Sequence, residues 1–505
     1  MKNKDTLLGP MLNLYPDSIG GQLSALVELL KDEPMKDAFQ SIYILPSLYH
    51  TDLDRGFSVQ DYEINGTIAK EENLVTLQEM GIDLKLDFIL NHLSVLSPQF
   101  QDLLKNGEKS KYKDFFIHWN RFWDGYGEMS EEGYILPEKK YIQDMFFRKE
   151  GLPILMVQFP DGSKQPYWNT FYQEIKEEED GSVSYLGQMD LNIQDESVWQ
   201  HYQDTLKKLA SYGAKIVRLD AFAYAPKAVG RKNFLNEPET WDLLEKIQKI
   251  ADPYALRLLP EIHATYEEGI YQTLADKGYW VYDFFLPGLI RYTFVKKDAT
   301  KLVRWINEVV DKGIQTVNML GCHDGIPVLD LKGLLSEEEI EDLIATLKKR
   351  GGYVKDLHGE KKMYYQVNMT YFSALNRDEK QLLLARALQL FMPGKPQIWY
   401  LDLFAGENDV EAVKKAGAGG HKEINRTNLD IEVVKEKIKE DVVVKQLELL
   451  HFRKHFPAFK EGATITCHTK GSNIEIKWKN ELACATLKAN LEDYDYSIEQ
   501  EEYGL

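Results

Sequence analysis

Apolar and polar positions along this chain form two kinds of segment that a glycine repeatedly joins. Amphipathic helical patterns end in Gly and an apolar run follows at once, as in LQEMG/IDLKLDFIL, KLASYG/AKIVRLD, LADKG/YWVYDFFL, EVVDKG/IQTVNML and LFMPG/KPQIWYL. A helix commonly ends before a residue in the left-handed conformation, which costs Gly least. The pattern therefore predicts a helix, a turn and a strand at each of these glycines, which are Gly81, Gly213, Gly278, Gly313 and Gly394.

Three further apolar runs, TLLGPMLNLY, QSIYILP and ALRLLPEIH, bring the expected strands to eight, with helical patterns between most of them. This alternation predicts an α/β protein built on a (β/α)8 TIM barrel. Two long intervals interrupt it, and short alternating runs such as ATITCHT and NIEIKWK end the chain. We expect barrel parts at 1–90, 194–324 and 377–457, loop-rich inserted domains B at 91–193 and B′ at 325–376, and a small C-terminal antiparallel β-domain at 458–505.

The composition narrows the class of protein. A formal net charge of −19 argues against a nucleic-acid or anionic-membrane partner, because a polyanion would be repelled. Pro10 interrupts the first apolar stretch, and no run approaches the roughly 20 apolar residues that span a bilayer, so we expect neither a signal peptide nor a membrane helix. Three scattered cysteines fit neither a disulfide framework nor a structural zinc site. A cytoplasmic enzyme acting on small molecules is expected.

Ionisable residues collect at the ends of the expected strands, where barrel enzymes carry their chemistry. The third strand ends DFILNH, the fourth RLD, the fifth LLPEIH and the seventh MLGCHDG. These ends bring together Asp87, Asn91, His92, Arg218, Asp220, Glu261, His263, His323 and Asp324. A lone Asp at a strand end is more often a cap or half of an ion pair, but three carboxylates converging with histidines favour catalysis.

Arg218 and Asp220 share one face of the fourth strand, because side chains alternate along a strand. An arginine roughly 7 Å below the carboxylate would keep it ionised and ready to act as a nucleophile. Retaining glycosyl transfer needs such a nucleophile and a carboxylic acid about 5 Å away, and Asp220 and Glu261 fit these two roles. A metal site is the competing interpretation, but no His-x-His or His-Glu-x-x-His spacing supports it. We therefore expect no metal and no other cofactor.

The strand ends resemble the four signature regions of the α-amylase superfamily: DFILNH, RLDAFAY, LPEIH and CHDG, in that order. More narrowly, the chain resembles the sucrose phosphorylase group and its relatives acting on sucrose 6-phosphate, glucosylglycerol or glucosylglycerate. The motifs that carry this resemblance are LYPDSIGG, DRGFSVQDY, FRKEGLP, CHDGIPV, YYQVNMTYFSAL, FAGENDVEAVKK and EINR. They span nearly the whole chain and are weakest beyond about Pro457.

The resemblance implies that Asp220 is the nucleophile, Glu261 the general acid/base and Asp324 the transition-state stabiliser. It implies that the glucosyl unit contacts Asp54, Phe57, His92, Gln188, Arg218, Tyr224, His323, Gln366 and Arg426. For His263 it implies a contact with the leaving group or with phosphate. Cationic inserted segments would bind inorganic phosphate or the acceptor, with Arg148, Lys149 and Tyr365 favoured over Lys361 and Lys362.

The sequence departs from the family where many members read Gly-Arg-Asp-Ile-Asn-Arg-His-Tyr, because it has GGHKEINRTN. The segment YVKDLHGEKKMYY is also unusually basic, and this charge would suit a phosphorylated or carboxylated acceptor. We expect a retaining α-glucoside phosphorylase that acts on sucrose or a related glucoside and on inorganic phosphate, as a monomer or homodimer. Open alternatives are a phosphorylase for sucrose 6-phosphate, glucosylglycerol or glucosylglycerate, a hydrolase or transglucosidase of the same superfamily, and a non-catalytic sugar-binding barrel.

Overall fold

Eight parallel strands form the centre of the molecule. The computed structural model describes residues 8–145, 147, 151–179, 183–357, 363–417 and 420–504, with the backbone alone for 355–357 and 363–365. The strands pair in the order β14-β13-β5-β2-β1-β20-β16-β15. Since the first and last strands of this order also contact each other, the sheet nearly closes, and the expected barrel is confirmed. Their bounds are β1 Met11–Leu14, β2 Ser41–Ile44, β5 Asp83–Ile89, β13 Ala214–Asp220, β14 Arg257–Pro260, β15 Val281–Asp283, β16 Thr316–Met319 and β20 Lys395–Trp399.

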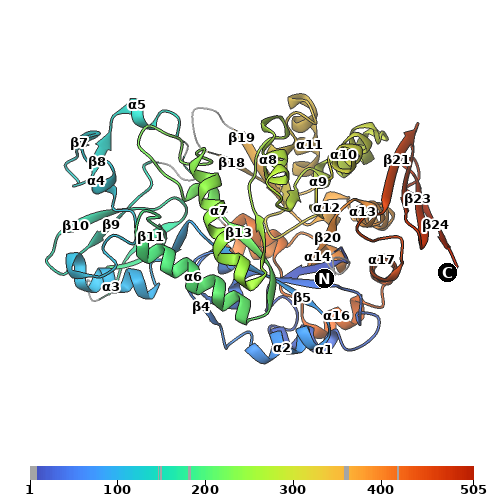
Figure 1. Ribbon diagram of the computed structural model, residues 1–505, viewed down its shortest axis with the longest axis horizontal. Coiled ribbons are helices and arrows are strands. Elements are labelled where there is room, and N and C mark those ends of the chain that lie inside the picture. Colours follow the sequence, from blue (N-terminus) through green and yellow to red (C-terminus); the bar gives the residue numbers. More distant parts are fainter. Residues whose placement is uncertain are drawn as a thin grey trace.

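Helices cover the outside of the barrel (Figure 1). The glycines expected after helices all have positive φ, from 63° at Gly313 to 92° at Gly394. At Gly394 a Cβ atom would also lie 2.3 Å from the carbonyl oxygen of Thr316, so glycine alone fits there. The covering helices are α1 Leu23–Leu29, α2 Glu71–Glu79, α6 Glu196–Ser211, α7 Glu239–Ala251, α8 Ile270–Asp276, α9 Leu286–Lys296, α10 Thr300–Asp311, α13 Glu379–Phe391, α16 Ile431–Lys437 and α17 Asp441–His455.

The last helix of the barrel differs from the sequence pattern. The apolar pattern from about Ile431 to Phe456 predicts a single helix, but the structure has two, α16 and α17, with a break between Ile438 and Glu440. Asp430 caps α16 by accepting a hydrogen bond from the backbone N–H of Glu432. Because the apolar positions continue in register across the break, the pattern alone does not reveal it.

In Figure 1 the segment between β5 and β13 lies at the left of the molecule, the C-terminal sheet lies at the right, and the segment after β16 lies between them. Near β5 and β13 the chain forms β6 His92–Ser94, α3 Pro98–Asn106, α4 Trp119–Phe122, β7 Gly127–Met129, β8 Ile135–Pro137, α5 Lys139–Ile142, β9 Ile154–Gln158, β10 Lys164–Trp168, β11 Gln173–Glu177 and β12 Val183–Asp190. After β16 it forms β17 Ile326–Pro327, α11 Glu337–Lys349, β18 Tyr353–Leu357, β19 Met363–Asn368 and α12 Tyr371–Ala374. Between β20 and α16 lie α14 Tyr400–Leu403 and α15 Val410–Ala416. The C-terminal antiparallel sheet consists of β21 Thr464–Lys470, β22 Asn473–Lys479, β23 Ala483–Asn490 and β24 Tyr496–Glu502. The domain boundaries given above remain predictions.

The barrel interior is polar below the mouth. Lys85 and Asp87 follow each other on one face of β5, and Asp87 stands beside Arg218 in the register of β5 and β13. Tyr43 donates a hydrogen bond to Asp87, while Lys85 donates to Gln397 at 2.6 Å.

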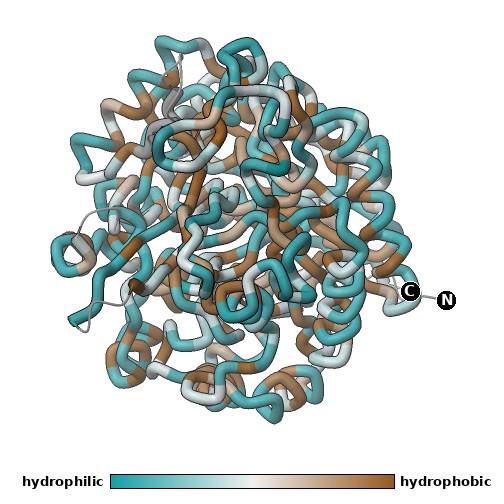
Figure 2. The backbone as a smooth tube through the Cα atoms, turned by 90° about the vertical axis from the view of Figure 1, so that its left-hand side faces the viewer, coloured by the Kyte–Doolittle hydropathy of each residue, from teal (hydrophilic) through white to brown (hydrophobic). Residues whose placement is uncertain are grey.

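The helices on the outside of the molecule alternate between hydrophilic and hydrophobic residues (Figure 2), as expected for helices with one buried face. No helix among the described residues has the length and apolar character needed to cross a membrane.

Candidate active site

One arginine joins three carboxylates at the ends of β5, β13 and β14. Arg218 Nη1 lies 2.6 Å from Asp87 Oδ1 and 2.8 Å from Asp220 Oδ1, and Nη2 lies 2.8 Å from Glu261 Oε1. The guanidinium is almost fully buried, as is Asp87 beside it. The expected pair of Arg218 and Asp220 is thus present, and the same guanidinium also aligns Glu261 with Asp220.

These carboxyls compete for one positive charge, and the competition sets their protonation. Burial raises the pKa of Asp220 to about 8, with Glu261 and Asp87 adding to the effect and Arg218 opposing it. Burial also acts to raise the pKa of Glu261, but Arg218 and His263 outweigh it and lower that pKa. Arg218 does lower the pKa of Asp220, as expected, but burial and the neighbouring carboxyls outweigh this effect, because the guanidinium is shared. Asp220 and Glu261 together hold one proton near neutral pH.

His263 extends this cluster away from Arg218. Its Nε2 lies 3.6 Å from Glu261 Oε1, and its Nδ1 lies 3.2 Å from Asp330 Oδ2. The ring of Phe284 stacks on the imidazole, with 3.9 Å between ring centroids. Both Glu261 and His263 lie just after β14, which ends at Pro260.

A second charged cluster holds Asp324. Lys422 Nζ lies 2.7 Å from Asp324 Oδ1 and 3.2 Å from Asp54 Oδ2. Arg426 Nη1 lies 3.1 Å from Asp54 Oδ1, and its Nη2 lies 3.6 Å from Asp324 Oδ1. These four side chains form a closed ring of two cations and two carboxylates, to which His323 adds a 3.2 Å contact with Asp324 Oδ2.

The electrostatics of this ring oppose those around Asp220. Burial acts to raise the pKa of Asp324, but His323, Lys422 and Arg426 outweigh it and hold the pKa well below its usual range. Burial lowers the pKa of His323, so its ring stays neutral near pH 7. As expected, β16 has ended by this point, at Met319, which frees His323 and Asp324 from strand alternation.

Aromatic rings and neutral polar groups form the wall between the clusters. Phe57 stacks on His323 with 4.9 Å between ring centroids and 15° between planes. His92 Nε2 and Gln188 Nε2 each lie 2.9 Å from the backbone carbonyl oxygen of Phe57. Tyr224 packs edge-on against Phe171, whose ring also contacts His92. Apolar faces beside convergent polar groups are typical of a sugar pocket.

Not every expected residue joins these groups. Gln366 is buried on β19, and its Nε2 has no hydrogen-bond partner within the described part of the chain. No described contact links it to the catalytic carboxylates. Arg148 and Lys149 lie outside the described residues, and so does the side chain of Tyr365. Their assignment to phosphate or the acceptor therefore stays a prediction.

Two charged residues at the site were missed by sequence reasoning. Lys422 lies in HKEINR, the segment that departs from the family pattern, so that departure was the available signal. Asp330 follows Asp324 by six positions in DGIPVLD. The sequence around it does not distinguish it from an Asp exposed on the surface. Both lie in loops or short 3-10 turns, where residue spacing does not predict which way a side chain points.

The arrangement suits acid/base and nucleophilic chemistry on a neutral sugar. It holds a carboxyl pair that shares a proton, a third carboxylate kept ionised, and an aromatic wall. Across the described ranges, no group of three or more His, Cys, Asp or Glu side chains is placed to hold a metal ion.

Comparison with known proteins agrees with this geometry. Residues 35–281 match the family model for the α-amylase catalytic domain. The chain is 52% identical to the sucrose 6(F)-phosphate phosphorylase of Ilumatobacter coccineus over 98% of this chain and 96% of the relative. It is 33% identical to the sucrose phosphorylase of Streptococcus mutans over 97% of each chain. The crystal structure of sucrose 6F-phosphate phosphorylase from Thermoanaerobacter thermosaccharolyticum superposes with a TM-score of 0.87, at 33% identity, over 100% of this chain and 98% of that one. The chain belongs to the sucrose phosphorylase group of the α-amylase superfamily.

Proposed function

We propose that this protein is a retaining α-glucoside phosphorylase, a glycosyltransferase that moves a glucosyl unit from sucrose or a related α-glucoside to inorganic phosphate. The observation that carries the proposal is the single guanidinium of Arg218, which binds Asp220 and Glu261 at 2.8 Å through different nitrogens. Retaining transfer requires two carboxyl groups held close together in this way.

In the first step Asp220 attacks the anomeric carbon of the donor. The bond from this carbon to the bridging oxygen breaks, and Glu261 gives its proton to that oxygen as the second sugar leaves. The product is a β-glucosyl ester of Asp220. Since the bridging oxygen of a bound glucoside accepts a hydrogen bond from Glu261, the shared proton is favoured on Glu261 when the donor is in place.

In the second step phosphate displaces Asp220 from the same carbon. A phosphate oxygen attacks, the ester bond breaks, and Glu261 takes the phosphate proton. The two inversions together give α-glucose 1-phosphate. Glu261 ends protonated and Asp220 ends ionised, so the enzyme is ready for the next donor.

Asp324 supplies negative charge while the sugar carries positive charge. Its low pKa keeps it ionised, which favours the oxocarbenium-like transition state. We assign the far edge of the glucosyl unit to Asp54 and Arg426, and its ring face to Phe57. The remaining contacts, from His92, Gln188, Arg218, Tyr224, His323 and Gln366, are proposed from the family resemblance.

Sucrose 6F-phosphate is the donor that we favour over sucrose. The relative at 52% identity carries that name, and so does one from Thermoanaerobacterium thermosaccharolyticum at 34% identity. The basic segment around Lys361 and Lys362 would suit a phosphorylated leaving sugar. Arg148, Lys149 and Tyr365 remain the proposed contacts of phosphate or the acceptor.

A donor panel tests the proposal. The purified protein is incubated with sucrose 6F-phosphate, sucrose, glucosylglycerol or glucosylglycerate, each with and without phosphate, and glucose and glucose 1-phosphate are quantified. We expect α-glucose 1-phosphate only with phosphate, and fastest from sucrose 6F-phosphate. Glucose release at an equal rate without phosphate would identify a hydrolase instead.

We further propose that both substrates are free small molecules and that the enzyme works in the cytoplasm as a monomer or homodimer. The described cysteines, Cys322, Cys467 and Cys484, are buried free thiols, as is usual in a reducing compartment.

A further inference from the structure

Asp330 is a buried carboxylate that the proposed mechanism does not use. It lies on a short 3-10 turn, Leu329–Leu331, and is 1% exposed. Both of its oxygens lie within hydrogen-bond distance of His263 Nδ1, at 3.3 and 3.2 Å. Burying an ionised carboxylate without a partner costs folding free energy, so the contact with the imidazole is needed to offset that cost.

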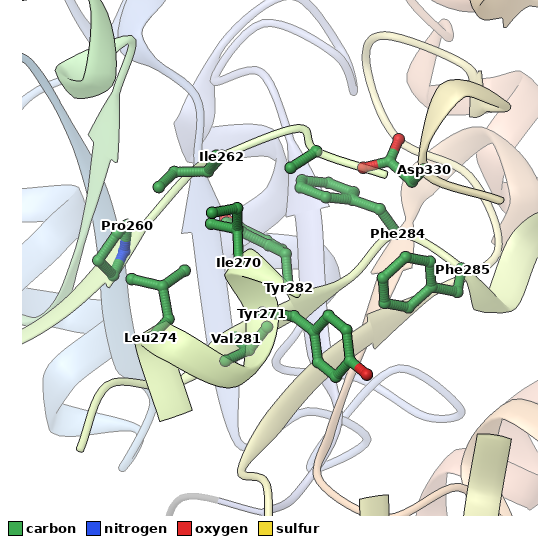
Figure 3. Close-up of a pocket in the computed structure, with 11 residues that line it drawn as sticks. Pro260, Ile262, Ile270, Tyr271, Leu274, Val281, Tyr282, Phe284, Phe285 and Asp330 are labelled. Atoms are coloured by element: carbon green, nitrogen blue, oxygen red, sulfur yellow. The ribbon is translucent and has the colours of Figure 1, made fainter. Parts of the chain in front are cut away.

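The surroundings of His263 fix the ring in place. Phe284 stacks on one face, and Figure 3 shows Phe284 and Asp330 among the residues lining a cavity of about 20 Å³. This cavity is near the size of one water molecule. The His263 ring itself is held by the stacked ring of Phe284 and by the contact of Nδ1 with Asp330. With Nδ1 on Asp330, the ring directs Nε2 toward Glu261, 3.6 Å away.

We propose that Asp330 is a positioning residue that holds His263 as an imidazolium beside Glu261, and that this fixed positive charge lets phosphate compete with water for the glucosyl unit. The inference rests on the proposed phosphorylase function. Charged groups that face the ring include Glu261 after β14 and Asp330 after β17, while Arg218 contacts the same Glu261 oxygen as His263. Asp283, on β15, points elsewhere and accepts a hydrogen bond from Trp305.

The chemistry explains why this charge would discriminate between acceptors. After the first step Glu261 is ionised, and Asp324 is ionised throughout, so an entering phosphate meets two negative charges. Water meets no such repulsion. An imidazolium next to Glu261 offsets the repulsion and can donate Nε2–H to a phosphate oxygen, so its loss should slow phosphate far more than water.

Burial acts to lower the pKa of His263, but Asp330 and Glu261 raise it to about 10. The imidazole of the wild-type protein is therefore charged near neutral pH. Asp330→Asn removes the carboxylate with little change of volume. The pKa of His263 should then fall toward or below about 6.5, so the charge is lost as the pH rises through that value.

The test compares phosphorolysis and hydrolysis of one donor by wild-type and Asp330→Asn enzyme between pH 5.5 and 8. We expect kcat/KM for phosphate to fall about 10- to 100-fold at pH 8, with hydrolysis changed less than about threefold. The ratio of variant to wild type should recover toward pH 5.5, where His263 regains its proton. Titration of phosphate itself cancels in this ratio.

Asp402→Asn is the matched control. Asp402 is also 1% exposed, and its Oδ1 accepts a hydrogen bond from the backbone N–H of Tyr371 that an Asn oxygen can accept equally well. His263→Gln should show the same phosphate-specific loss without recovery at low pH, and adding Asp330→Asn to it should cost nothing more. If Asp330→Asn does not fold, His263→Gln decides: equal losses in phosphorolysis and hydrolysis overturn the inference.

The two proposals fail separately. A wild-type enzyme that makes no glucose 1-phosphate overturns the proposed function. A wild-type phosphorylase whose Asp330→Asn variant keeps the same preference for phosphate over water at pH 8, or shows a loss that does not change with pH, overturns only the role of Asp330.

Discussion

The two cationic centres of the barrel mouth, Arg218 and Arg426, differ in how much negative charge each one faces. Arg218 serves Asp87, Asp220 and Glu261 without another cation in contact with all three, and the whole group is largely shielded from water. Arg426 shares Asp54 and Asp324 with Lys422, and Asp54 is 35% exposed. Arg426 Nη1 also lies 3.5 Å from Glu423 Oε1, and the Glu423 side chain is 33% exposed. The first cluster thus has one guanidinium for three largely buried carboxylates, whereas the second has two cations for three carboxylates, two of which are partly exposed.

This difference explains how one pocket can contain carboxyls with opposite tasks. A cluster short of positive charge keeps a proton, because burying several ionised carboxylates together is costly. A cluster with more cations and more exposed carboxylates stays ionised. The pKa of Asp220 is accordingly raised to about 8, and that of Asp324 is held well below its usual range. Acid/base exchange therefore belongs to the Arg218 side, and fixed negative charge belongs to the Arg426 side.

The largest effect is expected from Asp220→Asn, which removes the nucleophile and keeps the shape of the Arg218 cluster. Turnover should fall by at least about 10⁴-fold, because no covalent intermediate can form. Initial rates of glucose 1-phosphate formation measure this, and circular dichroism checks that the fold is intact. Residual turnover within a hundredfold of wild type would assign the nucleophile to another residue.

Glu261→Gln should have the next largest effect, and its size should depend on the leaving group. Loss of the acid is expected to slow cleavage of sucrose or its phosphate by about 10²- to 10⁴-fold. α-Glucosyl fluoride needs little proton assistance, so its first step should be much less affected. Fluoride release and fructose release are compared for the same variant. Equal losses on both donors would mean that Glu261 is not the acid.

Lys422→Met removes one of the two cations of the second cluster. Asp324 and Asp54 then share Arg426 alone, so the far edge of the sugar is held less firmly. We expect KM for the donor to rise about tenfold with a smaller change in kcat, and Lys422→Arg to restore most of the affinity. Steady-state kinetics of the two variants measure this. An unchanged KM in Lys422→Met would place Lys422 outside the binding site.

The smallest effect concerns stability, and the two clusters should respond with opposite signs. Because the pKa of Asp220 is raised, the folded protein keeps a proton that the unfolded chain loses above about pH 4, so the free energy of unfolding falls between about pH 4 and pH 8. Asp220→Asn removes this loss. Because the pKa of Asp324 is lowered, its ion pairs add stability above about pH 4 that is lost as the pH falls through its folded value.

At pH 8 we therefore expect Asp220→Asn to raise the midpoint of thermal unfolding by about 1 to 3 °C and Asp324→Asn to lower it by a similar amount. The gain in Asp220→Asn should shrink toward pH 5. Scanning calorimetry at pH 5, 6.5 and 8 measures both. Shifts of the same sign at pH 8 would contradict the difference between the clusters.

Much of the fold was predictable because its signals are local and repeated. Each helix-Gly-strand unit carries its own evidence, and Gly394 is even required by a close backbone contact with Thr316. The Arg218 cluster was also predictable, because parallel strands bring their carboxyl ends to one side of the barrel. The alternation of side chains along a strand then places Arg218 below Asp220. The break between α16 and α17 was not predictable, because a few residues of turn leave the apolar pattern intact.

The rest of the site depends on loops and on total charge. Lys422 contacts Asp324, and Asp330 contacts His263, from loop segments that are distant in the sequence. The spacing of apolar residues does not predict the path of such segments. The sequence prediction for Asp220 considered only its pair with Arg218, which does lower the pKa of Asp220, and left out the neighbouring carboxyls that raise it. Only the structure shows that Asp87 and Glu261 also contact the guanidinium of Arg218.

The most direct test of the account is to trap the glucosyl-enzyme. The Glu261→Gln variant is incubated with α-glucosyl fluoride in the absence of phosphate, quenched, digested and sequenced by mass spectrometry. The account predicts one glucosyl unit attached to Asp220, and its release as α-glucose 1-phosphate when phosphate is added before quenching. A glucosyl unit on Asp324 or Asp87, or turnover with no covalent adduct, would contradict it.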